Sequence, residues 1–199
     1  MKNNMIIAGV PRAGKSSLSH LLSQKYGYKH VSMDAIVAGF ERVFPELGIA
    51  WFPSKAADVP PLEVLRNASG KIALFIAAML DSGEYDEFEP GMVVDVYQLF
   101  PEDYAKHLKG KNCEIVYLIT SDVTPQERFS IFKTYDTQKD YTFVTPDDEL
   151  HEGCIQLVAQ SIFYKNQCIA HNVPYYETAK NRVDVFHKII ESLSVRTMV

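Results

Sequence analysis

The chain has 199 residues, of which 47% are hydrophobic and 23% are charged, and its net charge is −5. These values predict one globular domain over residues 1–199 and exclude a disordered or low-complexity chain. The negative charge argues against a broad grip on nucleic acid, no apolar stretch is long enough to span a membrane, and no signal-peptide pattern is present, so a cytoplasmic protein is expected.

The first part of the chain alternates short apolar runs with helical spacing. The apolar run before the first glycine predicts a buried strand, and the leucine spacing after it predicts a helix that buries Leu18, Leu21 and Leu22. In chain order, the sequence predicts a strand at 5–8, a helix to about 27, a strand at 30–32, a helix over 34–44, an irregular connection over 45–61 and a long helix over 62–83.

The second part continues the same alternation. Residues 124–127 have the capping-box spacing with proline at the first helical position, which predicts the start of a helix. In chain order, the sequence predicts a strand at 92–96, a helix over 101–109, a strand at 114–119, a helix over 124–138, a polar loop over 139–148, a helix over 148–171, a strand at 173–176 and a helix over 183–193. Strands that alternate with helices predict an α/β fold, a three-layer arrangement with a parallel sheet and helices on both faces.

Cysteine and histidine spacing gives no sign of a metal site. Cys113, Cys154 and Cys168 are far apart and lack CxxC spacing, which predicts reduced, buried thiols. The six histidines are dispersed without metal-ligand spacing. A small anionic ligand suits this composition better than a transition metal or a polyanion.

Residues 9–17 read GVPRAGKSS and fit the P-loop (Walker A) pattern GxxxxGK[ST], between a predicted strand and a predicted helix. The glycines let backbone N–H groups turn toward phosphate oxygens, and the amino end of the helix adds its unpaired N–H groups. Lys15 would supply a charge to the outer phosphates and Ser16 a hydroxyl to Mg²⁺. The predicted ATP-binding residues are Gly9, Pro11, Arg12, Ala13, Gly14, Lys15, Ser16 and Ser17. A chance match of the four fixed positions is of order 1% in a chain of this length.

The motif and the order of elements resemble the P-loop small-molecule kinases, the group that includes nucleoside monophosphate, shikimate and gluconate kinases. The resemblance covers nearly the whole chain in element order, although only residues 9–17 carry a strong motif. It implies a five-stranded sheet in the order 2-3-1-4-5, an acceptor-binding region at about 34–83 and a small lid at about 128–148. A GTPase is disfavoured because no DxxG or NKxD sequence follows the P-loop, and no LSGGQ-like stretch indicates a transporter ATPase.

Two carboxylates follow predicted strands. Asp34 resembles the aspartate that faces the phosphate-accepting hydroxyl in these kinases and would accept its proton, or it could cap the helix that follows. Asp95 is similar to the acidic residue of the DGFPR-like stretch of nucleotide kinases, which implies that it holds Mg²⁺ together with Ser16, through water, or contacts the acceptor as in relatives. Otherwise it would be a solvated strand-end acid. The glycine after that acid and the arginine after the proline are missing, which weakens a nucleoside monophosphate as the acceptor.

The predicted lid contains few cations. Arg128 resembles the first arginine of the lid region, which implies contact with the transferring phosphoryl group; otherwise it would be an exposed helix arginine. The other fixed cations between residues 120 and 165 are Lys133, Lys139 and Lys165.

Four further residues and one segment are candidates for ligand contact. Arg42 and Arg66 lie on the helices that wall the acceptor site in relatives and could bind an acceptor carboxylate or phosphate, although many such arginines are surface residues. Trp51 and Phe52 could close over a substrate or fill a hydrophobic gap. The segment 180–182 resembles the one that borders adenine, which makes Asn181 a candidate.

Together these residues predict an ATP- and Mg²⁺-dependent phosphotransferase that phosphorylates a small metabolite or nucleotide-like hydroxyl compound, with Lys15, Asp34 and Arg128 as catalytic residues. The expected partners are ATP and the acceptor, and a monomer or homodimer is expected, without nucleic acid or membrane. The arginine-poor lid motivates an alternative, a P-loop NTPase or regulatory ATP-binding module without an acceptor. A non-enzymatic binding protein is a second alternative.

Overall fold

The computed structural model describes residues 4–49, 60–84 and 91–196, and the candidates Trp51 and Phe52 lie outside these ranges. Five parallel strands form one sheet in the order β2-β3-β1-β4-β5, which confirms the predicted topology. The strands are β1 Asn4–Gly9, β2 Lys29–Ser32, β3 Met92–Val96, β4 Cys113–Ile119 and β5 Tyr175–Glu177.

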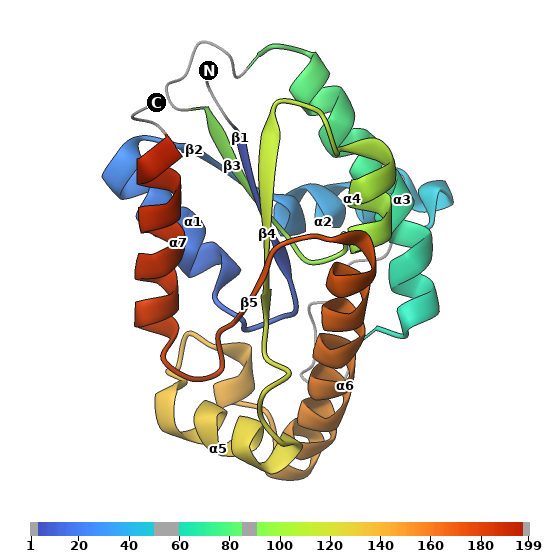
Figure 1. Ribbon diagram of the computed structural model, residues 1–199. Coiled ribbons are helices and arrows are strands. Elements are labelled where there is room, and N and C mark those ends of the chain that lie inside the picture. Colours follow the sequence, from blue (N-terminus) through green and yellow to red (C-terminus); the bar gives the residue numbers. More distant parts are fainter. Residues whose placement is uncertain (1–3, 50–59, 85–90, 197–199) are drawn as a thin grey trace.

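Helices cover both faces of this sheet, so the molecule has three layers (Figure 1). The helices α1 and α7 lie on one side, and α3, α4 and α6 lie on the other, with α5 at the end where the carboxyl ends of the strands emerge (Figure 1). The helices are α1 Lys15–Tyr26, α2 Met33–Val43, α3 Leu62–Asp81, α4 Pro101–His107, α5 Pro125–Tyr135, α6 Asp147–His171 and α7 Arg182–Arg196, with short 3₁₀ turns η1 Pro45–Leu47 and η2 Tyr141–Phe143.

Two inner strands of the sheet, β1 and β3, are buried along their whole length because helices cover both faces. Every residue of β1 and β3 is buried, whereas the edge strand β2 is partly exposed. The register aligns Asp95 of β3 with Ile7 of β1 and with Ser32 of β2. The sheet therefore brings the P-loop, the start of α2 and the end of β3 to one edge, where open parallel sheets bind ligands.

Several details of the sequence prediction were wrong. The helix α5 ends at Tyr135 rather than near residue 138, and residues 141–143 of the predicted polar loop form a 3₁₀ turn. Leu21 was expected on the buried face of α1, but it is 41% exposed, whereas Leu18 and Leu22 are fully buried. The reason is that the buried face of α1 also includes Lys15 and Ser19, which turns the position of Leu21 toward solvent. The last strand begins two residues later than predicted, because the backbone N–H of Val173 bonds to Cys168 O at the end of α6.

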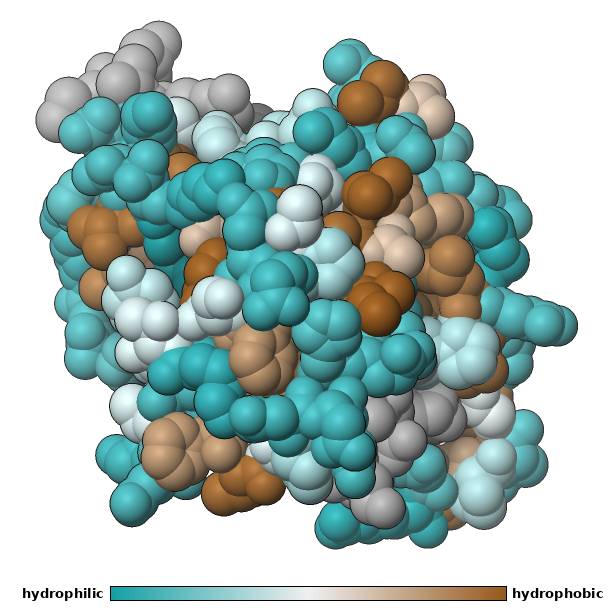
Figure 2. Space-filling view, turned by 90° about the horizontal axis from the view of Figure 1, so that it is seen from below, coloured by the Kyte–Doolittle hydropathy of each residue, from teal (hydrophilic) through white to brown (hydrophobic). Residues whose placement is uncertain are grey.

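A second, smaller core lies between α5 and α6. It consists of Phe132, Leu150, Cys154 and Leu157, with Phe129 packed against it. The capping box predicted at Thr124 is present, since Thr124 and Glu127 exchange both hydrogen bonds at the start of α5. This core and cap hold α5 at one end of the molecule. Figure 2 shows this end, and its surface is mostly hydrophilic with separate apolar patches.

The cysteines are free thiols, with Cys154 and Cys168 buried and Cys113 partly buried. The prediction of buried thiols is therefore confirmed for Cys154 and Cys168, whereas Cys113 is less buried than expected. Within residues 4–49, 60–84 and 91–196, each helix is too short or too polar to cross a membrane.

Candidate functional site

The P-loop requires glycine at two positions. Gly9 has φ 127, and a Cβ atom there would lie 2.0 Å from the carbonyl oxygen of Leu118 on β4. Gly14 has φ 98, and a Cβ atom there would lie 2.8 Å from Cζ of Phe186. Side chains rarely adopt such φ values, and neither position has room for one. The helix α1 then begins at Lys15, as predicted.

Lys15 points into the loop and is only 8% exposed. Its Nζ donates to the carbonyl oxygen of Val10 at 2.9 Å and lies 5.7 Å from the ring centre of Tyr97. Burial lowers the pKa of this ammonium, and the charges of Asp34 and Asp95 oppose that shift. The lysine is thus held at the carboxyl edge of the sheet, near two carboxylates.

Asp34 lies in the first turn of α2, which begins at Met33 with Ser32 at the cap position. The alternative that Asp34 is the helix cap is therefore wrong. Asp34 is exposed to solvent, but partial desolvation of its carboxyl by the surrounding residues and the charge of Asp95 raise its pKa, although Lys15 acts in the opposite direction. The three charges therefore lie close enough to one another to interact.

Asp95 is 2% exposed, so the alternative of a solvated strand-end acid is wrong. Its Oδ2 lies 2.7 Å from Nε2 of His30 on β2. Ser32 is aligned with Asp95, and His30, two residues earlier, projects from the same face of the strand. His30 was not singled out from the sequence, and the signal that would have found it is this alternation next to a strand-end carboxylate.

The donor set at this edge suits a magnesium ion. Ser16 is exposed in the first turn of α1, and Asp95 supplies a carboxylate that His30 holds through one oxygen. Among the residues that the structure describes, no group of three histidine, cysteine or acidic side chains could hold a metal by itself. Mg²⁺ needs no such group, since it binds through one or two hard oxygen donors, waters and substrate phosphates.

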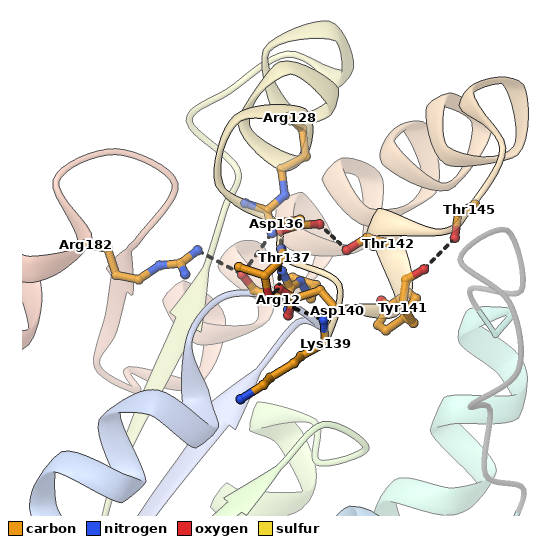
Figure 3. A network of polar contacts seen from close by, with 10 residues as sticks. All are labelled: Arg12, Arg128, Asp136, Thr137, Lys139, Asp140, Tyr141, Thr142, Thr145 and Arg182. Atoms are coloured by element: carbon orange, nitrogen blue, oxygen red, sulfur yellow. Dashed lines mark hydrogen bonds and ion pairs between the residues drawn. The ribbon is translucent and has the colours of Figure 1, made fainter.

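Arg12 joins the P-loop to the loop after α5 (Figure 3). It is a non-glycine residue with φ 61, and its guanidinium contacts both Asp136 and Asp140. Its carbonyl oxygen accepts from Nη2 of Arg128 at 3.1 Å and from Nη2 of Arg182 at 3.0 Å. From the sequence, Arg12 was predicted only as one of the ATP-binding residues of the P-loop, and no sequence pattern indicated these partners.

Arg128 is fully buried, so the alternative of an exposed helix arginine is wrong. Its guanidinium carbon lies 4.5 Å from the ring centre of Phe132. Burial lowers its pKa to about 10, and the charges of Arg182 and Arg12 act in the same direction. Its Nε and Nη1 have no hydrogen-bond partner among the described residues. Two N–H groups of a buried cation are therefore available for an anion beside the P-loop.

The two arginines predicted for the acceptor differ in their surroundings. Arg42 is exposed near the carboxyl end of α2. Arg66 forms an ion pair with Glu102, and its guanidinium carbon lies 5.5 Å from the ring centre of Phe100. Contact of Arg66 with an acceptor would require these interactions to rearrange.

Asn181 is exposed, has φ 53 and precedes α7, where its carbonyl oxygen accepts from the N–H of Val185 at 3.1 Å. The neighbouring Arg182, rather than Asn181, reaches the P-loop carbonyl of Arg12. Two of the lysines noted near the predicted lid are engaged in ion pairs, Lys133 with Asp147 at 2.7 Å and Lys165 with Glu177 at 3.2 Å.

Two further residues hold the site and were not predicted. Thr178 is buried after β5, with its hydroxyl 2.8 Å from the carbonyl oxygen of Ala13. Tyr97 lies under Lys15 and donates to Oε1 of Gln160 at 2.7 Å. Tyr97 follows the strand-end Asp95 by two residues, which is the signal that could have indicated it; Thr178 carries no such signal.

The sheet order and the P-loop geometry define the fold of the P-loop small-molecule kinases, and comparison with solved structures agrees. A sugar kinase from a Janibacter species matches with a TM-score of 0.55 and 12% identity, covering 98% of this chain and 95% of that chain. Shikimate kinase from Bacteroides thetaiotaomicron matches with a TM-score of 0.52 and 14% identity, covering 96% of this chain and 97% of that chain.

Shikimate kinase from Acinetobacter baumannii, solved in complex with shikimate, matches with a TM-score of 0.54 and 13% identity, covering 99% of this chain and 96% of that chain. The chain matches no protein-family model and no curated protein. At these identities the likeness establishes the fold, and the activity has to be argued from the site.

Proposed function

We propose that the protein is an ATP- and Mg²⁺-dependent phosphotransferase that phosphorylates a hydroxyl group of a small metabolite or nucleotide-like compound. The observation that carries the proposal is the position of Lys15, at the amino end of α1 beside Asp34 and Asp95. A helix amino end with a glycine loop and a lysine binds phosphate, and an adjacent carboxylate can accept a hydroxyl proton.

In this proposal each group of residues has one task. The backbone of residues 9–17 cradles the phosphates, while Lys15 neutralises charge on the outer ones. Asp34 orients the acceptor hydroxyl and takes its proton, and the buried Arg128 offers its two free N–H groups to the nucleotide anion. Arg42, Arg66 and Asn181 remain predicted ligand contacts, of the acceptor for the two arginines and of adenine for Asn181.

Bound Mg²⁺ would neutralise phosphate charge, with Ser16 and Asp95 as the residues that hold it. His30 supports this assignment because its contact fixes one carboxylate oxygen of Asp95. Residues 128–148 are proposed as the lid (below, the candidate lid), which would exclude water from the transfer. The free thiols and the use of ATP support a cytoplasmic location.

Asp34→Asn is expected to reduce acceptor-dependent transfer by about 10²–10⁴-fold, because the amide cannot take the hydroxyl proton. ATP binding should change little, since the backbone of residues 9–17 and Lys15 carry it. Transfer is measured as ADP release with a panel of hydroxyl metabolites, and binding is measured by calorimetry. The control Glu191→Gln changes an exposed acid on α7 and should leave both unchanged. Wild-type turnover in Asp34→Asn would remove Asp34 from the mechanism.

The midpoint of the acid limb of the pH–rate profile should lie above about pH 3.9, which is the ordinary pKa of an aspartate side chain. Asp34 acts only when ionised, and its pKa is raised in the folded protein, so activity falls with decreasing pH earlier than for an exposed aspartate. The profile of kcat/KM from pH 4 to 8 measures this limb, with circular dichroism at each pH as the check that the chain is folded. A limb that persists unchanged in Asp34→Asn would assign it to another group.

The alternative function is a P-loop NTPase without a small-molecule acceptor. The scarcity of arginine in the candidate lid favours it, because Arg128 is the single arginine between residues 128 and 148. ADP release that stays equally slow with every metabolite added would support this alternative. A marked increase with one hydroxyl compound would support the kinase.

A further inference from the structure

Two ion pairs connect the P-loop with the candidate lid. The cation, Arg12, belongs to the P-loop, and the carboxylates that it meets, Asp136 and Asp140, belong to the loop after α5. The partners are separated by 124 and 128 residues in sequence. The contact therefore joins two segments that no neighbouring backbone holds together.

The backbone of Arg12 adopts a conformation that favours glycine. Its φ of 61 is in the left-handed region, which a long side chain enters only at a cost in free energy. A glycine would adopt this turn without strain, so the turn alone does not account for an arginine. Strained residues persist where the surroundings fix them, and here the side chain and the carbonyl oxygen are both engaged.

The two carboxylates are held in place by the candidate lid itself (Figure 3). Asp136 accepts a hydrogen bond from the hydroxyl of Thr142. Asp140 accepts from the backbone N–H of Thr137 at 2.8 Å, and the hydroxyl of Thr137 lies 3.0 Å from the same carboxylate oxygen. Each carboxylate is thus oriented before it meets the arginine, which lowers the entropy cost of the ion pairs.

The ion pairs are also partly shielded from water. The side chain of Asp136 is 5% exposed, and those of Arg12 and Asp140 are 26% and 24% exposed. The guanidinium carbon of Arg12 lies 5.9 Å from the ring centre of Phe132, which covers one side of the network. Charge-assisted hydrogen bonds in such a setting are stronger and less sensitive to salt than exposed pairs.

We propose that Arg12 is a positioning residue that ties the candidate lid to the P-loop through Asp136 and Asp140. This inference rests on the proposed function, in which that segment covers ATP. Because the backbone of Arg12 belongs to the phosphate cradle, the position of the lid depends on the cradle. The single positive charge of the arginine also offsets half of the negative charge of the two carboxylates, which would otherwise repel the triphosphate more strongly.

The test compares amide hydrogen exchange of residues 136–143 in the wild-type protein, Arg12→Gly and the double variant Asp136→Asn/Asp140→Asn, all free of nucleotide. Either change should speed exchange in this segment about tenfold or more, while amides of β1 and β4 keep their protection. Glycine accepts the φ of position 12, and the asparagines preserve the shape of the carboxylates. The control Lys133→Gln breaks an exposed ion pair with Asp147 elsewhere in the candidate lid, and it should change the exchange of residues 136–143 less than about twofold.

Binding of a non-hydrolysable ATP analogue with Mg²⁺ separates positioning from simple packing. Arg12→Gly alone leaves the charges of both carboxylates without a cation, and their repulsion should weaken binding of the analogue. The triple variant Arg12→Gly/Asp136→Asn/Asp140→Asn lacks these charges, so its binding should be weakened less. Arg12→Lys should restore part of the exchange protection, because an ammonium can pair with one carboxylate at a time.

Unchanged protection of residues 136–143 in Asp136→Asn/Asp140→Asn would overturn the inference, whatever the fate of Arg12→Gly. Equal nucleotide affinity in the single and triple variants would overturn the electrostatic part. A wild-type protein that binds no ATP would refute the proposed function instead, and the exchange experiment without nucleotide would still decide whether Arg12 holds the segment.

Discussion

Replacing Lys15 with alanine is expected to abolish ATP-dependent turnover while leaving the fold intact. The loss should be at least about 10²–10³-fold, the size found when one group that stabilises transition-state charge is removed. The fold should survive because Nζ makes one hydrogen bond within the described part of the chain, to Val10 O, and because a buried ammonium carries a desolvation penalty that alanine does not. Alanine also suits the first turn of α1.

Turnover is measured as ADP release, and the fold by thermal denaturation followed by circular dichroism. The control Lys25→Ala removes an exposed lysine from the last turn of the same helix and should retain full activity. Wild-type turnover in Lys15→Ala would show that the phosphates are bound elsewhere. A Lys15→Ala protein that no longer folds would show that the lysine has a structural role that its observed contacts do not explain.

Replacing Gly9 with alanine is expected to destabilise the protein by more than about 3 kcal/mol, which places it among the most damaging single substitutions. The added Cβ would lie 2.0 Å from the backbone oxygen of Leu118, so β1 and β4 would have to separate. No side-chain movement can relieve a clash with backbone in the centre of a sheet. ATP binding should be lost with the turn.

Gly39→Ala is the matched control, because a Cβ atom at this position in α2 meets nothing within 4 Å. It should keep or raise stability by about 0.5–1 kcal/mol, since alanine favours the helix. Urea denaturation of the two variants and the wild type measures both effects. Equal midpoints for Gly9→Ala and the wild type would contradict the tight approach of β1 to β4.

The parts of the fold that follow from local pattern were predictable. The continuous apolar runs of β1, β3 and β4 indicated strands buried on both faces, and the glycine spacing of residues 9–14 indicated the turn that enters α1. Parallel strands and right-handed crossovers then limit the possible topologies, and the resemblance to known kinases specified the order. Elements whose limits depend on a tertiary contact, such as the start of β5, were less accurate.

The contacts that complete the site were not predictable, because they join residues far apart in sequence. The alternation of β2 places His30 on one face of its strand, but it does not show that Asp95, 65 residues later, lies beside it, and nothing near Arg12 indicates its two aspartates. The burial of Arg128 also depends on Phe132 and the P-loop together. Sequence spacing reports which face of an element a residue occupies, and the partner across the interface depends on how the elements pack.

A crystal structure of the protein with Mg²⁺ and a non-hydrolysable ATP analogue would show whether residues 9–17 hold the phosphates. The predicted result is a triphosphate enclosed by the backbone of residues 9–17, with Nζ of Lys15 moved from the Val10 oxygen to a phosphate oxygen. An analogue bound away from this loop, with Lys15 still on Val10, would contradict the account.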